Sequence, residues 1–356
     1  AEKLIQIAPV PMSKVLLQCS GSEANDTAIK LVWYYHHAIG KPEKRKIISR
    51  MGAYHGSTAA SISASGKPEM HADFGLPFPQ FRHTENPHYY RNHKDGESEE
   101  AFATRMADAL EAMILEEGPE TVAAFFAEPV MGAGGAILPP KTYFEKVQAI
   151  LKKYDILFVA DEVICGFGRT GNMWGSQTYN LQPDIISCAK ALSAAIQPIS
   201  ALLINEKVYK AMLAQSGKLG SFAHGYTYTG HPVAAAVALE VLKIYDEIDI
   251  VQHVKRVGAH FQKGLAKLAD HPLVGDARGV GLIAGVDLVS NKKTREPLKG
   301  AAAIQDRAKE NGLILRFIGN RVAFSPPLII TEEQVDEMMS RLKKTLDEAH
   351  SELRTH

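Results

Sequence analysis

Two short apolar segments of this chain each end in a residue type that can do chemistry. Residues 157–160 read Leu-Phe-Val-Ala and lead into the acidic pair Asp161 and Glu162. A second short run, Ile-Ile-Ser-Cys-Ala at 185–189, ends at Lys190. Short runs of this kind are typical of strands buried in a parallel sheet. Ligands bind outside the carboxyl ends of such strands, so the sequence predicts a carboxylate and an amine at one edge of a sheet.

This pair of groups suits one cofactor in particular. An aspartate can hold a protonated pyridine nitrogen and a lysine can hold an aldehyde, and pyridoxal 5'-phosphate (PLP) needs both partners. A strand-end aspartate is also common as a turn or helix-cap residue, and a strand-end lysine is usually solvated. Each residue alone is more often structural, so the interpretation depends on what surrounds the pair.

A possible phosphate site lies near the start of the chain. The apolar segment Lys14–Cys19 is followed by Ser20, Gly21 and Ser22, and then by a helical pattern through His37. Free N–H groups at a helix start point toward an anion, and glycine allows its close approach. A simple N-cap at Ser22 explains the same residues. No Walker A or Gly-x-Gly-x-x-Gly pattern follows a strand, so a nucleotide-dependent enzyme lacks support.

An aromatic residue follows the next predicted strand, Ile47–Arg50. Tyr54 lies between Gly52 and Gly56 and could stack on a planar ligand, although a core tyrosine in a turn fits equally well. Residues 66–95 are rich in Pro, His and aromatic residues and show little periodicity. A stretch of this length indicates a functional loop or a subunit contact. Its histidines fit no zinc motif, so no metal site is predicted.

Composition narrows the class of protein. The chain has 356 residues, enough for two domains, and 46% of them are apolar, as in ordinary globular proteins. Lys plus Arg and Asp plus Glu both number 40, so no charge favours nucleic acid or an anionic membrane. The 3 cysteines have no paired spacing, which indicates a reducing, cytoplasmic location. No apolar stretch reaches membrane-spanning length.

Strands alternate with helices through the first two thirds of the chain, which predicts an α/β fold with a mostly parallel, doubly wound sheet. Two more strands are expected at Val122–Phe126 and Ile199–Ile204. The periodicity predicts helices at Ser98–Glu117, Tyr143–Tyr154, Val233–Ile248 and Val251–Leu268.

The pattern changes near residue 253. Beyond it we expect a strand within 282–288, a helix at 301–311, a hairpin of 313–316 with 322–325, and a final helix at 331–353. The predicted organisation is a large domain over 1–252 and a small α+β domain over 253–356.

Several local motifs together resemble one family. They are Ser-Gly-Ser-Glu-Ala-Asn, Tyr-His-Gly, Ala-Asp-Glu-Val with Gly-Phe-Gly-Arg-Thr-Gly, Ala-Lys-Ala-Leu, Tyr-Thr-Gly-His-Pro and Arg-Gly-Val-Gly. From about Lys14 to its end the chain resembles the class III aminotransferases, which are PLP enzymes of fold type I. Within that family it resembles the ω-amino-acid and amine:pyruvate transaminases.

The resemblance implies roles around the cofactor ring. Lys190 would hold the cofactor covalently and then move a proton as base and acid. Asp161 would keep the pyridine nitrogen protonated. Val163, two residues further along the same expected strand, would pack on one ring face and Tyr54 on the other. Glu128 would lie near the cofactor.

The resemblance also implies contacts to the phosphate and the substrate. Gly21 and Ser22 would hold the phosphate. Thr227 would reach it from a neighbouring subunit, which implies a homodimer or a dimer of dimers. The other implied cofactor-binding residues are Ser20, His55 and Tyr226, and the implied substrate-binding residues are Arg316, as a mobile carboxylate clamp, and Trp174.

Two features depart from the family pattern. The family's N-terminal segment, which forms part of the small domain and one wall of the substrate pocket, is expected to be missing from this chain. In addition, Ser193-Ala-Ala-Ile-Gln replaces the usual glycine-bearing turn after the lysine, which should stiffen that loop.

The expected function is ping-pong transfer of an amino group from an ω-amino acid or amine to pyruvate or a similar α-keto acid. Three alternatives stay open at this point. They are a PLP enzyme of the same fold with other chemistry, such as an aminomutase, decarboxylase or racemase; a PLP-binding protein without turnover; and a nucleotide-dependent oxidoreductase. The sequence does not name the amine donor.

Overall fold

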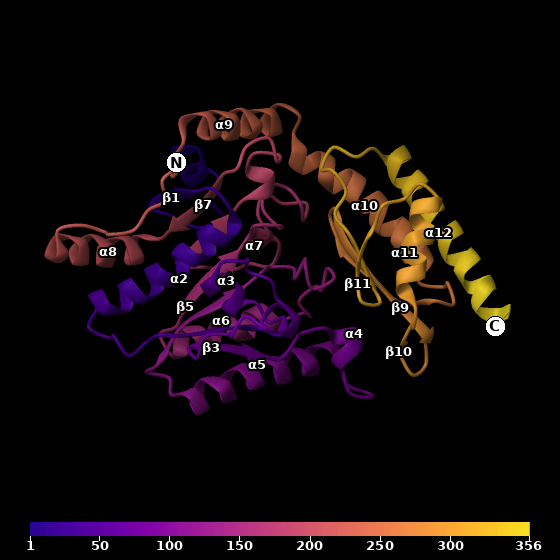
Figure 1. The fold of residues 1–356 in the computed structure, drawn as a ribbon, viewed down its shortest axis with the longest axis horizontal. Coiled ribbons are helices and arrows are strands. Elements are labelled where there is room, and N and C mark those ends of the chain that lie inside the picture. The colour runs from indigo at the N-terminus through magenta and orange to yellow at the C-terminus, as the bar shows by residue number, and fades with distance from the viewer. Residues whose placement is uncertain (356) are drawn as a thin grey trace. The chain divides into compact units, whose positions relative to one another are not determined.

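The computed structural model of the protein describes residues 1–355, with side chains through 353 (Figure 1). The chain forms two compact units, each built from more than one segment. The first comprises residues 1–129, 139–167 and 173–247. The second comprises 130–138, 168–172 and the chain from 248 onward. Two short segments from the first half of the chain, 130–138 and 168–172, therefore belong to the second unit.

A 7-stranded sheet forms the centre of the first unit, in the order β1-β7-β6-β5-β4-β2-β3. Strands β2 to β6 run parallel, whereas β7 is antiparallel to β6 and to β1. The prediction of a mostly parallel α/β sheet is confirmed. The strands are β1 (Lys14–Gln18), β2 (Lys46–Arg50), β3 (Phe81–Thr84), β4 (Val122–Ala127), β5 (Leu157–Asp161), β6 (Ile185–Cys188) and β7 (Ser200–Ile204).

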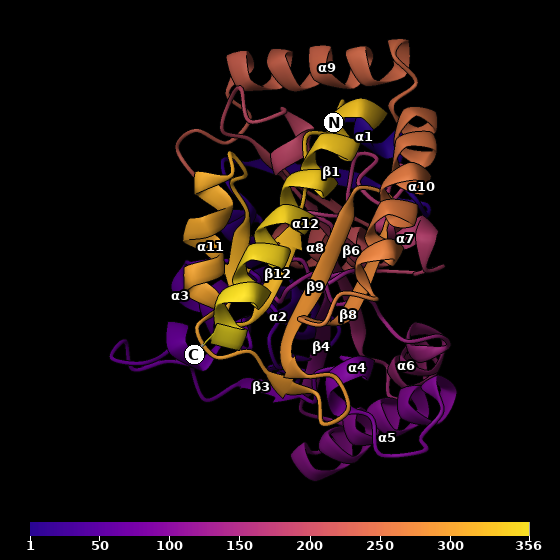
Figure 2. The same ribbon diagram turned by 90° about the vertical axis from the view of Figure 1, so that its right-hand side faces the viewer.

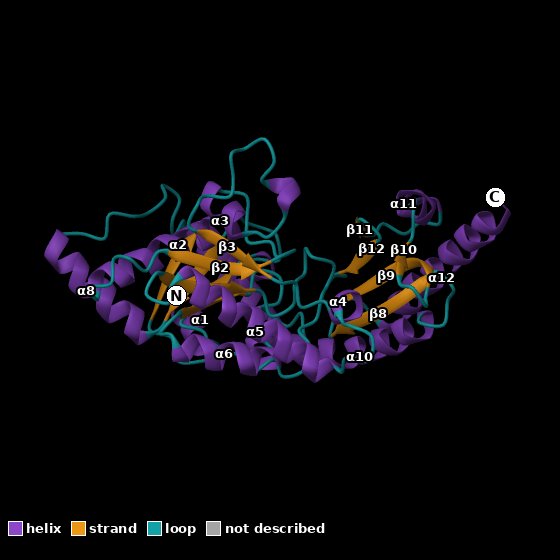
Figure 3. Cartoon of the chain, turned by 90° about the horizontal axis from the view of Figure 1, so that it is seen from below, coloured by secondary structure: helices purple, strands orange, loops and turns teal. Residues whose placement is uncertain are grey.

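Helices cover both faces of this sheet, and the strand residues alternate between the two cores. Phe125 packs in one core with α5 (Glu99–Glu117) and α6 (Tyr143–Lys153). Phe126, the next residue, packs in the other core with α2 (Gly21–Ala38). Figure 3 shows α2 with α3 (Ala59–Ala64) on one side of the strands and α5 with α6 on the other. This two-sided burial explains why the strands read as continuous apolar runs.

The remaining helices of the first unit are shorter or lie at its rim. Helix α9 runs beside the N-terminal helix in both views, and Lys3 bonds Asp246 at 2.5 Å (Figures 1 and 2). These elements are α1 (Glu2–Gln6), η1 (Pro68–Met70), α4 (Tyr89–Asn92), α7 (Gly175–Thr178), η2 (Lys190–Leu192), α8 (Glu206–Leu219) and α9 (Pro232–Glu247).

Several elements of this unit were not predicted, and β3 and α8 are the two that matter most. The stretch 66–95, expected to be a loop, contains β3 at the edge of the large sheet. Its sequence, Phe-Arg-His-Thr, buries only its first and last residues, so it lacks the apolar run of a central strand. Helix α8 follows β7 and is capped by Asn205, whose side chain accepts from Val208 N. An Asn cap before an amphipathic segment is a readable helix start.

The second unit is a smaller sheet with helices. Its strands follow the order β10-β9-β12-β11, with β8 also paired to β9. Helix α10 packs against β8 and α12, and α11 packs against α12 (Figure 2). The elements are β8 (Val274–Val280), β9 (Ile283–Asn291), β10 (Glu296–Pro297), β11 (Arg316–Ile318), β12 (Arg321–Phe324), α10 (Ile250–Leu268), α11 (Ala301–Glu310) and α12 (Glu332–Thr355).

Hydrogen bonds connect the segments 130–138 and 168–172 to the rest of the second unit. Arg278 donates to the carbonyl oxygens of Gly135 and Ala136 at 2.7 and 3.0 Å. Arg169 donates to the carbonyl oxygens of Leu282 and Pro326 at 3.0 and 2.5 Å. Among the helices of the described residues, none has the length and apolar character needed to cross a bilayer.

Candidate active site

A cavity of about 360 Å³ opens in the first unit at the carboxyl ends of its parallel strands. A volume of this order is typical of small-molecule sites. The cavity brings together residues from the ends of β5 and β6, the start of α2 and the segment after β2. The predicted site residues that line it are Ser20, Gly21, Ser22, Tyr54, His55, Glu128, Asp161, Val163 and Lys190.

Asp161 is the last residue of β5 and only 3% of its surface is exposed. One carboxylate oxygen, Oδ2, accepts from Asn25 Nδ2 at 2.7 Å and faces His55 Nδ1 at 2.9 Å. The other, Oδ1, accepts from the backbone N–H of Val163 at 3.1 Å. A buried carboxylate with hydrogen-bond donors on both oxygens is held in one orientation, and here it faces the cavity.

Val163 lines the cavity as predicted but for a different structural reason. It was expected to lie on the same strand as Asp161 and to share its face. Strand β5 ends at Asp161, and the chain turns immediately, with Gly166 N bonded to Glu162 O at 2.9 Å. The hydrogen bond from Val163 N to the Asp161 side chain, and not strand alternation, places Val163 at the cavity wall.

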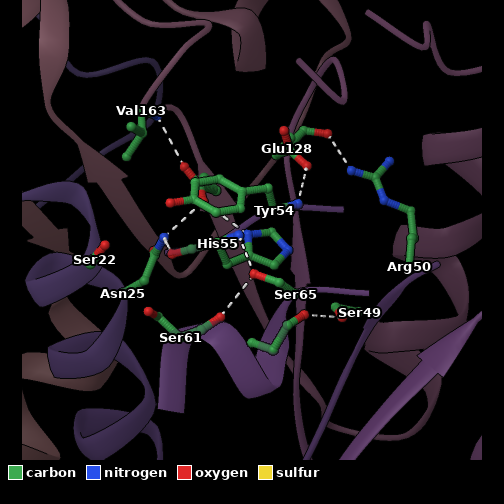
Figure 4. Close-up of polar contacts among 12 residues, drawn as sticks. Ser22, Asn25, Ser49, Arg50, Tyr54, His55, Ser61, Ser65, Glu128 and Val163 are labelled. Atoms are coloured by element: carbon green, nitrogen blue, oxygen red, sulfur yellow. Dashed lines mark hydrogen bonds and ion pairs between the residues drawn. The ribbon is translucent and has the colours of Figure 1, made fainter. Parts of the chain in front are cut away.

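Glu128 follows β4 and contributes a second buried carboxyl group, 3% exposed. Its Oε1 accepts from the Tyr54 N–H at 3.2 Å, and its backbone oxygen accepts from Arg50 Nη2 at 2.6 Å (Figure 4). Burial raises the pKa of Glu128, and the positive charge of nearby Arg50 opposes that rise. Arg50, itself 1% exposed, therefore fixes the strand end that carries Glu128.

Glu162 points away from the cavity lining and is completely buried. Its Oε1 accepts from Ser176 N and Ser176 Oγ at 2.5 and 2.6 Å, and its Oε2 accepts from Gly175 N at 3.0 Å. Burial, reinforced by the neighbouring Asp161 charge, raises the pKa of Glu162 to about 7. This side chain closes the base of the 163–174 loop, so it is a structural partner of the site.

The start of α2 forms the opposite wall. The N-cap is Ser20, whose side chain accepts from Glu23 N, so the simple N-cap interpretation of Ser22 is wrong. Ser22 Oγ instead accepts from Ser57 N at 3.0 Å. Gly56, at φ 141°, allows this close approach, because a Cβ there would lie 2.8 Å from Ser22 Cα. The first N–H groups of a helix have no preceding helical carbonyl to bond, which leaves this helix end suited to an anion.

Lys190 does not lie on a strand. It begins the turn η2 two residues after β6 ends, and its φ of 46° falls in the left-handed region. Residues other than glycine, Asn or Asp rarely adopt that backbone conformation, and those held in it concentrate at functional sites. The turn over 190–197, which begins with η2, contains two further left-handed residues, Ala194 at φ 48° and Ala195 at φ 63°.

Three predicted residues of the first unit lie outside this cavity. Tyr226 is half-buried and lines a separate hollow beside β1, and Thr227 next to it is exposed. Trp174 is fully buried: its Nε1 donates to the Ile7 oxygen at 2.5 Å, and its ring centroid lies 5.0 Å from that of Phe167. In this chain the Trp174 ring is a core residue, and its predicted contact with substrate stays a prediction.

Arg316 belongs to the second unit. It is the first residue of β11, is exposed, and pairs in register with Ala323 of β12. The predicted hairpin is therefore present, but it begins at Arg316 and not at Leu313. Its proposed grip on a carboxylate stays a prediction.

Sequence reasoning missed some residues that shape the cavity. Asn25 donates to both Asp161 Oδ2 and the His55 backbone oxygen, each at 2.7 Å. Asn25 lies inside the recognised Ser-Gly-Ser-Glu-Ala-Asn motif, so its place in the motif was the available signal. Arg50 was also missed, although a charged residue at the end of an apolar strand carries the same signal as Asp161 does.

Comparison with known proteins gives the family. The family profile described as Aminotransferase class-III matches residues 1–346. The chain is 55% identical over 333 residues to "Gamma-aminobutyrate transaminase 1, mitochondrial" of Oryza sativa subsp. indica, covering 92% of this chain and 64% of that protein. It is 52% identical to "Gamma aminobutyrate transaminase 3, chloroplastic" of Solanum lycopersicum, with coverage of 96% and 66%. The chain thus spans slightly less than two thirds of the length of these curated relatives.

Solved structures agree. A structure described as "Transaminase with L-ala" superposes with a TM-score of 0.98 at 55% identity, covering 99% of this chain and 84% of that one. The ω-transaminase from Pseudomonas jessenii in complex with PMP gives a TM-score of 0.96 at 53% identity, with coverage of 98% and 78%. The fold is that of the fold type I PLP transaminases. The chain belongs to the class III aminotransferases, a family that uses PLP.

The residues of the cavity fit that cofactor. Asp161 presents a buried carboxylate bonded by an amide, an imidazole and a backbone N–H, and a protonated ring nitrogen would be a charged partner for it. The α2 start offers an anion site, and Lys190 offers an amine at the same cavity. Tyr54 and Val163 line the space between these groups.

Proposed function

We propose that this chain forms the cofactor-binding core of a PLP-dependent aminotransferase, with a large cofactor domain and a small C-terminal domain. It would move an amino group from an ω-amino acid or amine to pyruvate or a similar α-keto acid. The observation that supports this most directly is the placement of a bonded, buried Asp161 and an amine, Lys190, at one cavity. The names of its relatives support transamination and a γ- or ω-amino donor.

The residues would divide the work as follows. Bound PLP supplies an electron sink for the carbon that carries the amino group. Asp161 accepts a hydrogen bond from the pyridine N–H and favours its protonated form by the opposite-charge effect. Gly21 and Ser22 hold the phosphate at the start of α2. Lys190 would hold the cofactor, and its amine would then move a proton at the substrate carbon.

A second copy of the chain is part of the proposal. The 225–230 loop carries an exposed Thr227, which would contact the phosphate of the neighbouring subunit. Helix α9, which follows this loop, exposes Val233, Leu239 and Ile244 at 41–55% of their surfaces, as an interface would require. The predicted cytoplasmic location stays a prediction from its free thiols, because the relatives named above are mitochondrial or chloroplastic.

Lys190→Ala tests the reaction class. The variant should fold and retain some PLP through its phosphate contacts, but transfer from donor to cofactor should be abolished because one side chain supplies both attachment and proton transfer. Single-turnover absorbance with donor alone is the measurement. Substantial turnover without an added amine would overturn the assignment. Formation of carbon dioxide or an isomerised amino acid by the parent would favour another PLP chemistry.

Arg316→Ala tests the acceptor. A charge-assisted contact to a carboxylate is worth roughly 1.5–3 kcal/mol, so the half-reaction with pyruvate should weaken about ten- to a hundredfold. The half-reaction with an amine that lacks a carboxylate should change much less. Equal loss in both halves would assign Arg316 to the fold, and no loss in either would place the clamp elsewhere.

A further inference from the structure

The turn that carries Lys190 is held in a costly backbone conformation. Lys190, Ala194 and Ala195 all have positive φ angles, 46°, 48° and 63°. The first bonds of the turn lengthen from 3.0 Å for Leu192 N to Ala189 O to 3.4 Å for Ala195 N to Lys190 O, whereas shorter bonds close its far end, 2.9 Å from Ile196 N to Ser193 O and 2.6 Å from Ser193 Oγ to Gln197 O. Left-handed residues with a Cβ are disfavoured by roughly 1–2 kcal/mol each, so a contact from outside the turn is needed most near Lys190.

One such contact comes from α9. Tyr245 Oη donates to the backbone oxygen of Ala191 at 2.8 Å, across 54 residues of sequence. Tyr245 is 8% exposed, so this bond is shielded from water. Ala191 O receives only a 3.3 Å bond from within the turn, donated by Ala194 N. The tyrosine therefore supplies the shorter of the two bonds at the residue that follows Lys190.

We propose that Tyr245 is a positioning residue for Lys190: its hydroxyl fixes the Ala191 carbonyl and so holds the lysine backbone in the conformation that directs the amine to the cavity. This inference rests on the proposed function. The turn carries alanine at the left-handed positions 194 and 195. The strain is opposed by an anchor from another element and not relieved by glycine. Helix α9 also carries the exposed Val233, Leu239 and Ile244, so the anchor comes from the helix that is proposed to meet a second subunit.

Tyr245→Phe removes the hydroxyl and keeps the ring. Tyr154→Phe is the matched control, because that hydroxyl also makes a 2.8 Å bond, to Glu111 Oε1, away from the cavity. Purified apoprotein is mixed with PLP, and the rate of covalent attachment is followed by stopped-flow absorbance. Borohydride trapping and peptide mass then locate the linkage at Lys190. Denaturant unfolding of each apoprotein is measured in parallel.

We expect attachment to slow about three- to tenfold in Tyr245→Phe, the range that loss of one hydrogen bond gives. The Tyr154→Phe control should attach PLP at the parent rate, although its unfolding midpoint can fall as well. A parent rate in Tyr245→Phe would overturn the inference and leave the proposed function intact. A parent protein that traps no PLP would overturn the proposed function itself.

Ala194→Gly keeps the test decisive if Tyr245→Phe does not fold, because Ala194 is exposed and does not line the cavity. Glycine relaxes the far end of the same turn without removing a core side chain. The expected result is slower attachment with an unfolding midpoint no lower than that of the parent. If the relaxed turn attaches PLP as fast as the parent, the held backbone has no part in directing the lysine, and the inference is wrong.

Discussion

The turns that follow β5 and β6 lie side by side, since Asp161 pairs in register with Ser187, but they hold their functional side chains in opposite ways. After β5, the carboxyl groups of Asp161 and Glu162 are each fixed by three donor groups from the protein. After β6, Lys190 is fixed through its backbone, in a left-handed conformation.

This difference follows from the chemistry of the two groups. A carboxylate only accepts hydrogen bonds when ionised, so surrounding N–H and O–H groups can hold it without reacting with it. A lysine that must form and release a covalent bond cannot be tied down at its nitrogen in the same way. Fixing its backbone is another way to direct the side chain. Side-chain changes should therefore damage the β5 turn most, and backbone changes should affect the β6 turn.

The largest expected effect in this comparison is that of Asp161→Asn. An amide supplies no negative charge for a ring nitrogen, and its NH2 group would face the donor of Asn25 or of Val163. We expect weaker PLP affinity and a loss of orders of magnitude in single-turnover rate, measured with the apoprotein reconstituted at saturating PLP. Parent-like rates would make Asp161 a structural strand-end residue.

Glu162→Gln tests whether Glu162, unlike Asp161, acts on the stability of the fold and not on the cofactor. The pKa of Glu162 rises in the folded protein from 4.5 to about 7, chiefly through burial. A raised pKa favours the protonated form, so the stability due to this group is fully present below pH 4.5 and is lost as pH rises through about 7. The difference is on the order of 3 kcal/mol. Glutamine stays neutral and removes this dependence.

The measurement is the free energy of unfolding of apoprotein from pH 5 to 8. The parent should lose its advantage over Glu162→Gln as pH rises, and Glu116→Gln at the exposed end of α5 controls for the removal of one charge. A constant difference between parent and variant across this range would contradict the raised pKa. A pH-independent loss of PLP affinity would instead assign Glu162 a direct part in the cavity.

The sequence could predict where these two strands end but not which residues surround their carboxyl ends. An apolar run that stops at Asp161 or at Lys190 is a local signal, and parallel strands bring their carboxyl ends to one edge. The partners are not local: Asn25 lies 136 residues from Asp161, and the bonds of Glu162 to Gly175 and Ser176 close a loop of irregular structure. Such contacts depend on tertiary packing, which periodicity does not report.

The backbone conformation of the turn after β6 could not be predicted from the sequence either. The replacement of a glycine-bearing turn by Ser193-Ala-Ala-Ile-Gln predicted a stiffer loop, and the structure adds that the two alanines have positive φ. Alanine has no sequence signal for that region, because its intrinsic preference is for the helical one. The short edge strand β3 was missed for a related reason, since only Phe81 and Thr84 of its four residues are buried.

The smallest expected effect is a change in stability that reports backbone strain in the turn after β6 without altering the cavity. Ala194 is exposed and does not line the cavity, so Ala194→Gly changes the backbone preference and little else. Glycine avoids the roughly 1–2 kcal/mol cost of a left-handed Cβ but loses about 0.5–1 kcal/mol more entropy on folding. The net gain in the free energy of unfolding should be at most about 1.5 kcal/mol, read from denaturant unfolding of the apoprotein. The exposed helical Ala214 of α8 is the control, and Ala214→Gly should destabilise by about 0.5–1 kcal/mol, because there glycine brings only its cost. A loss of stability in both variants would show that the turn carries no strain. The turn after β6 would then not differ from the turn after β5 by holding its functional residue in a strained backbone.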